Sequence, residues 1–186
     1  MIQASKIDLN ADIGEGMPYD KELINYISSC NIACGGHAGD DNSILETISI
    51  AKENNVKIGA HPSYPDKLNF GRKSIDISIK ELLKSIDIQL NNFKNTCYKL
   101  NAEWHHIKFH GALYNDLKTD LEKAKSLVEL LEKKYSGVLL YVPPNSIIKN
   151  IAERSLKICI EGFADRVYNE DLSLVPRSLL NASLSE

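Results

Sequence analysis

Short runs rich in apolar and β-branched residues alternate along this chain with longer amphipathic segments. In the longer segments the apolar residues recur every three or four positions, as on one face of a helix, whereas the short runs have the length of strands. Strands that are separated by helices usually run parallel, with right-handed crossovers. The alternation therefore predicts an α/β fold with a parallel sheet. Six runs are candidate strands: 5–9, 31–33, 56–60, 106–110, 138–142 and 156–160.

A serine or threonine followed three residues later by glutamate marks the expected start of three helices. In such a capping box the hydroxyl and the carboxylate bind free backbone N–H groups at the helix start. The pattern occurs at 43–46, 78–81 and 119–122, and shorter helices are predicted at 20–28 and 146–154. The chain has 186 residues and no evident boundary, repeat or low-complexity tract. We therefore expect one domain with a substantial core.

Polar and glycine-containing segments follow nearly every candidate strand. They are not gathered at a single point of the sheet. No Gly-x-Gly-x-x-Gly opens a helix after the first strand, and the chain contains no Walker-type Gly-Lys-Ser/Thr motif. In an open doubly wound sheet the ligand binds at one switch point, whereas a barrel collects residues from the ends of many strands. The distribution favours a barrel of the TIM type.

Composition excludes several classes of protein. The net charge is −3 and no basic block occurs, so neither nucleic acid nor a membrane surface is an expected partner. The first ten residues lack the apolar run of a signal peptide, and no stretch approaches membrane-spanning length. Four scattered cysteines are expected to be reduced, and cytoplasmic location is the default. The spacing of Cys30, Cys34 and His37 is weak support for zinc, and Cys30 is expected to be packed.

Three of the five histidines stand just past an apolar run and beside glycine or proline: His37, His61 and His110. A side chain in this position is presented at the rim of a sheet by a rigid strand. A single histidine is more often structural, but three at successive strand ends favour a shared site. They are candidate metal ligands or acid–base groups. The glycine-rich segment around His37 also offers N–H groups to an anion, while Asp40 is better explained as a helix cap.

The first strand alternates polar and apolar residues. Asp8, Asn10 and Asp12 share one face, and two glycines then turn the chain on either side of Glu15. Burying three polar side chains is costly unless they are paired or bind a ligand. A functional face is therefore predicted, with a solvated edge strand as the alternative.

Two further segments place charged residues at the same rim. Lys108 and His110 share one face of the fourth strand and are expected near Asp8 and Asp12, where a buried lysine needs a carboxylate partner or has a lowered pKa. His105 and His106 begin that strand, so a role in stability is expected for them.

After the last strand come Glu161, Asp165 and Arg166. The arginine suits an anionic group of a substrate, and an Asp165–Arg166 surface pair is the alternative. The polar loop 64–74, which contains Arg72, could form a lid.

The motifs together resemble the LamB/YcsF family. The resemblance rests on six blocks between Lys6 and about Ser178: Asp8-Leu9-Asn10-x-Asp12-x-Gly14-Glu15, Asn31-Ile32-Ala33-Cys34-Gly35-x-His37-Ala38-Gly39-Asp40, Gly59-Ala60-His61-Pro62-x-Tyr64-Pro65-Asp66, Phe70-Gly71-Arg72, Lys108-x-His110-Gly111-Ala112-Leu113-Tyr114-Asn115 and Glu161-Gly162-Phe163-Ala164-Asp165-Arg166-x-Tyr168. It implies a seven-stranded TIM-like barrel of the glycoside hydrolase/deacetylase type. It also implies ATP-dependent opening of 5-oxo-L-proline to L-glutamate, together with subunits B and C.

The resemblance suggests roles for individual residues, with ATP as co-substrate and a divalent metal ion as a candidate cofactor. Asp12 or Glu15 is the expected base, Lys108 and Arg166 are expected to stabilise charge, and the histidines are ligands or acid–base groups. The candidate catalytic residues are Asp12, Glu15, Lys108 and His110; the candidate substrate-binding residues are Asn10, Arg72, Asp165 and Arg166; and the candidate metal ligands are Asp12, His37 and His61.

Members of the family usually continue beyond the segment that resembles residues 174–178, through another helix and a last strand. We therefore expect a barrel that lacks its last strand and helix, with residues 1–186 as a single shortened domain. Two alternatives to ATP-dependent lactam hydrolysis stay open. One is a metal-dependent amidase or deacetylase that acts alone, and the other is a non-catalytic scaffold within a complex.

Overall fold

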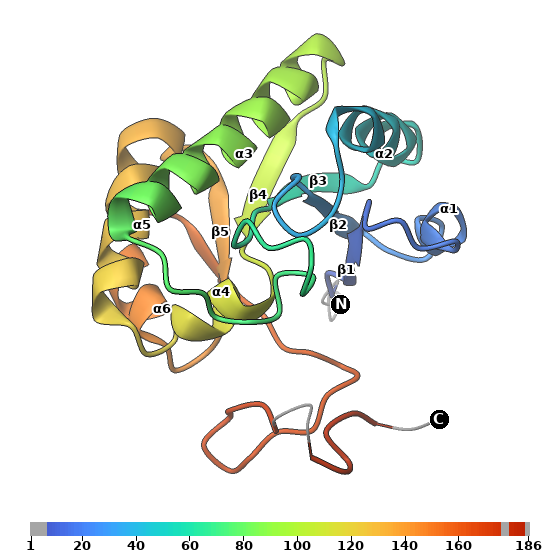
Figure 1. The fold of residues 1–186 in the computed structure, drawn as a ribbon. Coiled ribbons are helices and arrows are strands. Elements are labelled where there is room, and N and C mark those ends of the chain that lie inside the picture. Colours follow the sequence, from blue (N-terminus) through green and yellow to red (C-terminus); the bar gives the residue numbers. More distant parts are fainter. Residues whose placement is uncertain (1–6, 176–178, 185–186) are drawn as a thin grey trace, which may run out of the picture.

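The computed structural model describes residues 7–175 and 179–184. Its centre is one six-stranded sheet in which every strand runs parallel to its neighbours and the strand order follows the chain (Figure 1). A doubly wound sheet would reverse direction after its first strand, so this order confirms a TIM-like barrel architecture. Among the described residues the first and last strands do not pair, and the barrel is open between them. The strands are β1 Asn10–Ile13, β2 Ser29–Ala33, β3 Lys57–His61, β4 Trp104–Lys108, β5 Leu139–Val142 and β6 Ile158–Ile160.

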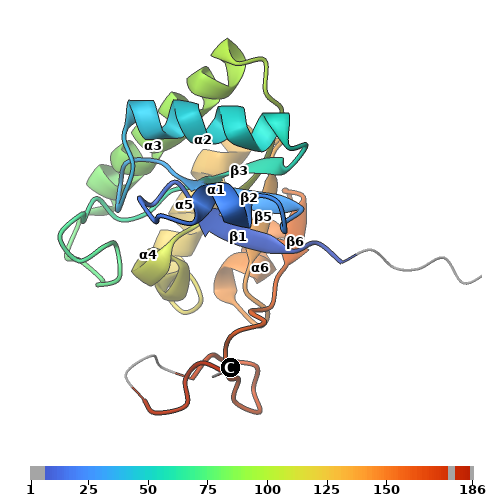
Figure 2. The ribbon, with the colours of Figure 1, turned by 90° about the vertical axis from the view of Figure 1, so that its right-hand side faces the viewer.

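Helices lie along the outside of the curled sheet (Figures 1 and 2). Helix α2 packs against β2 and β3, and α3 lies between α2 and α5. The long helices bury an apolar stripe against the sheet, including Ile48 of α2, Phe93 of α3 and Leu127 of α5, all fully buried. The helices are α1 Asp20–Leu23, α2 Asp41–Glu53, α3 Ile79–Lys99, α4 Gly111–Asp116, α5 Leu121–Tyr135 and α6 Ile147–Ala152.

The predicted helix starts are right in one case and displaced in two. Ser78 caps α3, and Glu81 completes the capping box as predicted. Helix α2 begins three residues earlier than predicted because Asp40 is the N-cap and accepts from Ser43 N, while the Ser43 side chain binds back to Asp40 N. Helix α5 begins one residue late because Asp120, rather than Thr119, accepts a backbone N–H. In both cases an aspartate near the hydroxyl residue is better placed to bind the free amide.

The first strand lies further along the chain than predicted. Residues 5 and 6 of the predicted strand fall outside the described part, and Ile7 and Leu9 are 90% and 51% exposed. Pairing with β2 begins at Asn10 opposite Ser29, because Leu9 O instead accepts the N–H groups of Ser28 and Ser29 at the turn into β2. The alternation of the segment is still correct, since Asn10 and Asp12 point into the barrel. The helix predicted over 20–28 ends at Leu23.

Strand β4 contains an irregularity that decides which side chains enter the barrel. Trp104 is opposite Ile58, but the next residue of β3, Gly59, is opposite His106, so β4 has one extra residue here. Trp104 therefore faces outward between Phe93 and Tyr135, whereas His106 and Lys108 both face inward. The bulge thus supplies the barrel interior with an imidazole and an ammonium group from one strand.

Beyond β6 the chain leaves the barrel as an extended segment that lies below it in both ribbon views (Figures 1 and 2). Antiparallel bridges join Arg166 to Ser183 and Tyr168 to Leu174. Residues 176–178, at the end of the stretch that resembles the family, fall outside the described residues. The four cysteines are free thiols, as predicted, and Cys30 is packed in the core. No helix in the described part is long and apolar enough to cross a membrane.

Candidate active site

The carboxyl ends of the strands surround a cavity of about 720 Å³. In TIM-type barrels this end carries the functional residues, since the loops after the strands converge there. Its walls come from the ends of β1, β3 and β4, from the loop before α3 and from the segment after β6. The polar residues lining it are Asp12, Glu15, His61, Arg72, Lys108, His110, Asn115, Tyr114 and Arg166.

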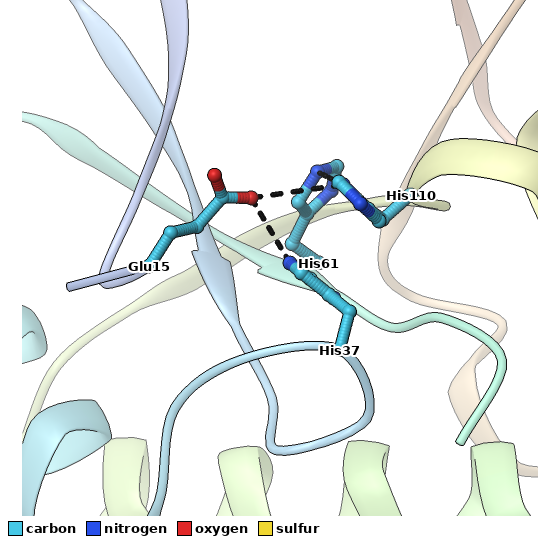
Figure 3. A group of neighbouring side chains, drawn as sticks. All are labelled: Glu15, His37, His61 and His110. Carbon is cyan, nitrogen blue, oxygen red and sulfur yellow. Dashed lines mark hydrogen bonds and ion pairs between the residues drawn. The ribbon is translucent and has the colours of Figure 1, made fainter. Parts of the chain in front are cut away.

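Four side chains at the carboxyl ends of the strands form a compact cluster (Figure 3). Glu15 follows β1, His37 follows β2, His61 ends β3, and His110 caps α4 after β4. One ligand atom of each lies within 4.8 Å of the others. The rings of His37 and His110 are stacked 3.6 Å apart, and His61 stands at right angles to both. Three consecutive strand ends therefore deliver three imidazoles to one carboxylate, as their positions in the sequence predicted.

The hydrogen-bond partners outside the cluster define the tautomers of His61 and His110. His61 Nδ1–H donates to the carbonyl of Lys108 at 2.7 Å, and His110 Nε2–H donates to the carbonyl of Phe70 at 2.9 Å. A carbonyl can only accept, so each neutral ring keeps its remaining nitrogen unprotonated. Those two nitrogens, His61 Nε2 and His110 Nδ1, face each other at 3.0 Å. A proton between them is therefore shared by two ring nitrogens that have no other donor in this contact.

The third histidine repeats this arrangement. The hydroxyl of Ser63 donates to the carbonyl of Tyr64, so it accepts from His37 Nδ1–H at 2.9 Å. His37 Nε2 then turns a lone pair toward Glu15 Oε1, also at 2.9 Å. Burial lowers the pKa of His37, and burial with the neighbouring histidines lowers the pKa of His110 to about 3. The rings of His37 and His110 and the carboxylate of Glu15 thus direct acceptors at one point beside His61 Nε2, and such a set suits a shared proton or a divalent cation.

A second charged group lies beside the cluster, on the ends of β1, β4 and β6. Lys108 Nζ is 3.2 Å from Asp12 Oδ1 and 3.4 Å from Glu161 Oε2, and it lies over the ring of Phe163 at 5.1 Å. Burial would lower the pKa of Lys108, but the two carboxylates raise it above its ordinary value. Burial would likewise raise the pKa of Asp12, whereas His61 and Lys108 hold it well below the usual range. Lys108 is therefore a charged group and cannot serve as a neutral base.

Asp12 connects the two groups. Its Oδ2 is 3.4 Å from His61 Nε2, and 35% of its side chain is exposed to the cavity. The predicted metal ligands were Asp12, His37 and His61; in the structure Glu15 and His110 complete the set around the two histidines, and Asp12 lies at its border. Asp8, which we expected near Lys108, instead accepts from the Tyr141 hydroxyl at the other end of the barrel.

The predicted substrate-binding residues are spread over three places. Arg72 is exposed, stacks on Phe70 at 5.1 Å and lines the cavity. Arg166 also lines it, with its guanidinium donating to the carbonyls of Val175 and Ala182. Asp165 is exposed. Asn10 lies deeper in the barrel, where its amide donates to Ser29 Oγ at 2.7 Å.

The loop 64–74 is attached to the barrel rather than free. Tyr64 is fully buried, and its hydroxyl donates to Asp116 at 2.6 Å, while Ala112 N donates to Gly71 O at 2.9 Å. Gly71 has φ +61°, and a Cβ there would come within 2.9 Å of His37 Cβ. The loop is therefore a wall of the site that supplies the Phe70 carbonyl to His110.

Sequence reasoning gave no role to two groups that the structure places at the site. Glu161 was recognised at the rim, but its pairing with Lys108 depends on how far the sheet curls. Ser63 follows His61 by two residues, and its contact with His37 depends on the loop conformation. For Glu161 the signal was its position directly after a strand; no local signal identified Ser63.

The fold and site define a class of protein: a TIM-like parallel barrel whose strand ends carry a histidine–carboxylate cluster next to a buried lysine. Comparison of sequences identifies the family within that class. The profile of the LamB/YcsF family matches residues 7–186, and the chain belongs to this family.

Named relatives and a solved structure agree with this assignment. Proteins named as the A subunit of 5-oxoprolinase, from Haemophilus influenzae (strain PittEE) and Pyrococcus abyssi (strain GE5 / Orsay), are 44% and 39% identical; the matches cover 95% and 97% of this chain and 73% of each relative. The crystal structure of a lactam utilization protein from Thermus thermophilus superposes with a TM-score of 0.93 at 32% identity, covering 98% of this chain and 76% of that one. The barrel fold is thus confirmed by an independent structure.

Proposed function

We propose that this chain is the A subunit of a cytoplasmic 5-oxoprolinase and hydrolyses 5-oxo-L-proline to L-glutamate with ATP as co-substrate and subunits B and C as partners. The observation that carries the proposal is the convergence of Glu15, three clustered histidines and charged Lys108 at one end of the barrel, beside the cavity. The names of the relatives, which refer to 5-oxoprolinase and to lactam utilization, supply the substrate class.

The chemistry requires a base, a charge stabiliser and a proton donor. Opening the lactam adds water to the ring carbonyl carbon and breaks its bond to nitrogen; the water's oxygen stays on carbon and a proton goes to the nitrogen. An unactivated lactam is a poor electrophile, so transfer of a phosphoryl group from ATP to its oxygen, with ADP leaving, would supply the driving force. Asp12 or Glu15 would accept a proton from the water that adds to the ring carbon and return a proton to the ring nitrogen as the C–N bond breaks. A second water would then release phosphate from the resulting acyl phosphate, and Lys108 would stabilise negative charge on the oxygens at this carbon.

The two arginines at the mouth of the cavity suit the carboxylate that 5-oxoproline carries. Both line the cavity: Arg72 is exposed, and Arg166 lies within the segment that follows β6. A guanidinium binds a carboxylate through two parallel N–H donors. In this arrangement the arginines bind the unreactive end of the substrate, and the lactam carbonyl reaches the Lys108 side of the cavity.

A second candidate function, metal-dependent amide hydrolysis without ATP, is favoured by one observation. Glu15, His37, His61 and His110 turn one ligand atom each toward a common point, and each histidine donates its other N–H to a group outside the cluster. This is the arrangement of histidine ligands whose tautomers are set by outer partners. A divalent cation held there would act as a Lewis acid on a carbonyl oxygen.

The deciding experiment measures glutamate release from 5-oxoproline by the chain co-purified with subunits B and C, with and without ATP and with and without a chelator. Glu15→Gln removes the charge of the central carboxylate, and Glu46→Gln, an exposed carboxylate on α2, is its matched control. We expect ATP-dependent release that E15Q abolishes and E46Q leaves intact. ATP-independent release that the chelator stops would favour the amidase, and complex formation without any turnover would favour a scaffold.

A further inference from the structure

We propose that His106 and Asn31 form a hydrogen-bonded chain beneath the site that holds the carboxylate of Asp12 in its working position. The inference rests on the proposed function, in which Asp12 is one of the two candidate bases, and it adds two positioning residues. Neither side chain lines the cavity, and both are fully buried in the barrel interior.

The first link is Asn31 on β2. Its Nδ2 donates to Asp12 Oδ1 at 2.7 Å and also to the side-chain oxygen of Asn10. Its Oδ1 accepts from His106 Nε2 at 2.7 Å. Asn31 therefore joins β1 to β4 across the barrel, and all of its side-chain polar atoms are used inside the protein.

The second link is His106, which reaches across an intervening strand. The ring spans from β4 to β2, and β3 lies between them in the sheet. Gly59 on β3 makes this possible, because a Cβ there would lie closer than 3 Å to three atoms of the imidazole. On its other side the ring stacks on Tyr141 at 4.2 Å. The imidazole is thus clamped in the plane that directs Nε2 at Asn31.

The carboxylate of Asp12, at the end of the series of hydrogen bonds, determines the direction in which each bond is donated. A carboxylate can only accept, and Lys108 and His61 keep Asp12 ionised, so Asn31 must turn its NH₂ group toward Asp12. Its oxygen then faces His106, which must carry its proton on Nε2. His105 Nδ1 lies 3.1 Å from His106 Nδ1 and donates to the lone pair left there. One set of proton positions satisfies every member of this chain.

Removing the donor at His106 would loosen the amide of Asn31. With an apolar side chain at 106, Asn31 Oδ1 keeps only the longer bond from Asn10 Nδ2 at 3.3 Å, so the amide is fixed from β1 alone. The donor to Asp12 would then be less firmly placed, and the carboxylate would be less well fixed between Lys108 and His61. Substitutions of outer partners that orient a site residue commonly reduce activity about 10- to 100-fold.

The first test examines the proton positions without any activity assay. In the uniformly ¹⁵N-labelled chain, two-bond nitrogen–proton correlations report which ring nitrogen of His106 carries hydrogen. We expect Nε2–H and a bare Nδ1 at pH 7. A proton on Nδ1 instead would reverse the donor directions and overturn the proposal, whatever the enzyme does.

The second test separates positioning from folding by kinetics of the complex with subunits B and C. His106→Gln keeps an N–H donor at similar reach, whereas His106→Leu does not, and Glu103→Gln, at an exposed position just before β4, is the control. We expect H106L to lower kcat by roughly 10- to 100-fold with KM within about twofold, and H106Q and E103Q to stay within about threefold of the wild type. Equal losses in H106L and H106Q, or a loss confined to KM, would overturn the positioning role. A wild-type complex without turnover would instead refute the proposed function and leave the proton test standing.

Discussion

Replacement of Gly59 by alanine should destabilise the protein strongly, although alanine suits a β-strand better than glycine does. The backbone of Gly59 is not in the left-handed region, so the substitution causes no backbone strain. The added Cβ would instead overlap the imidazole of His106. That ring is fully buried and stacked on Tyr141, so it has no free space into which it can move.

The magnitude follows from two losses. Overpacking of a filled interior costs about 1–3 kcal/mol. Displacing the ring also breaks the bond from His106 Nε2 to Asn31 Oδ1, and a buried donor or acceptor left without a partner costs about 1–3 kcal/mol. The expected decrease in the free energy of unfolding is therefore roughly 2–6 kcal/mol. Because small domains are stable by about 5–15 kcal/mol, G59A should still be measurable in cold buffer.

Urea unfolding of four proteins isolates this contact: wild type, Gly59→Ala, His106→Ala and the double variant. In the H106A background the cavity left by the ring accommodates the new methyl group, so G59A should then cost less than about 0.5 kcal/mol, giving a coupling of about 2 kcal/mol or more. Gly137→Ala is the control, since a Cβ at Gly137 meets nothing within 4 Å. An equal cost of G59A in both backgrounds would refute the reasoning, because it would mean that the imidazole is not what the glycine accommodates.

Three other outcomes are expected. Zn²⁺ or Mn²⁺ at about 100 times its Kd should stabilise the wild type by about 2.7 kcal/mol in a thermal shift measurement and leave Glu15→Gln unaffected; equal shifts in both would exclude the cluster as the binding site. Burial lowers the pKa of His106 to about 3, against about 6.5 when unfolded, so below pH 6.5 the unfolded chain binds a proton that the folded chain does not. The contribution of this group should be constant above pH 6.5 and fall by about 1.4 kcal/mol per unit as the pH decreases toward 3, so urea titrations should give a shallower slope for H106Q than for the wild type by this amount. Tyr64→Phe removes the hydrogen bond to the half-buried carboxylate of Asp116 and should cost about 1–3 kcal/mol, whereas Tyr98→Phe, at a side chain that is 88% exposed, should cost nothing measurable in the same urea titration.

The fold could be predicted because its signals are local. Apolar runs of strand length and helical periodicity identify the order of elements, and the order alone implies parallel strands. The first strand was displaced because Ile7 and Leu9 have the composition of a strand, yet they precede the first pairing with β2. The start of α2 was displaced because serine at 43 and aspartate at 40 are both good caps, and the local sequence does not state which binds the free amide.

The sequence predicts site residues only where they lie on a strand or directly after one. Period-two alternation correctly placed Lys108 on the face that meets Asp12, and glycine or proline after a strand correctly brought His37, His61 and His110 together. The choice between Asp12 and Glu15 as the carboxylate of the histidine cluster was beyond such reasoning. Glu15 lies past the end of β1, where the direction of its side chain depends on the turn rather than on the pleat.

His106 illustrates the remaining difficulty in physical terms. Its position at the start of a strand indicates the stable end of a barrel, and no neighbour in sequence indicates that its ring crosses β3. That crossing depends on the extra residue in β4, on the absence of a side chain at Gly59 and on the face of Tyr141, which come from three different strands. A role that arises from a bulge, a missing side chain and a stacked ring is a property of the assembled barrel. The position of the proton on His106 Nε2 is accordingly the measurable property that tests whether His106, in the barrel interior, acts on Asp12 through Asn31.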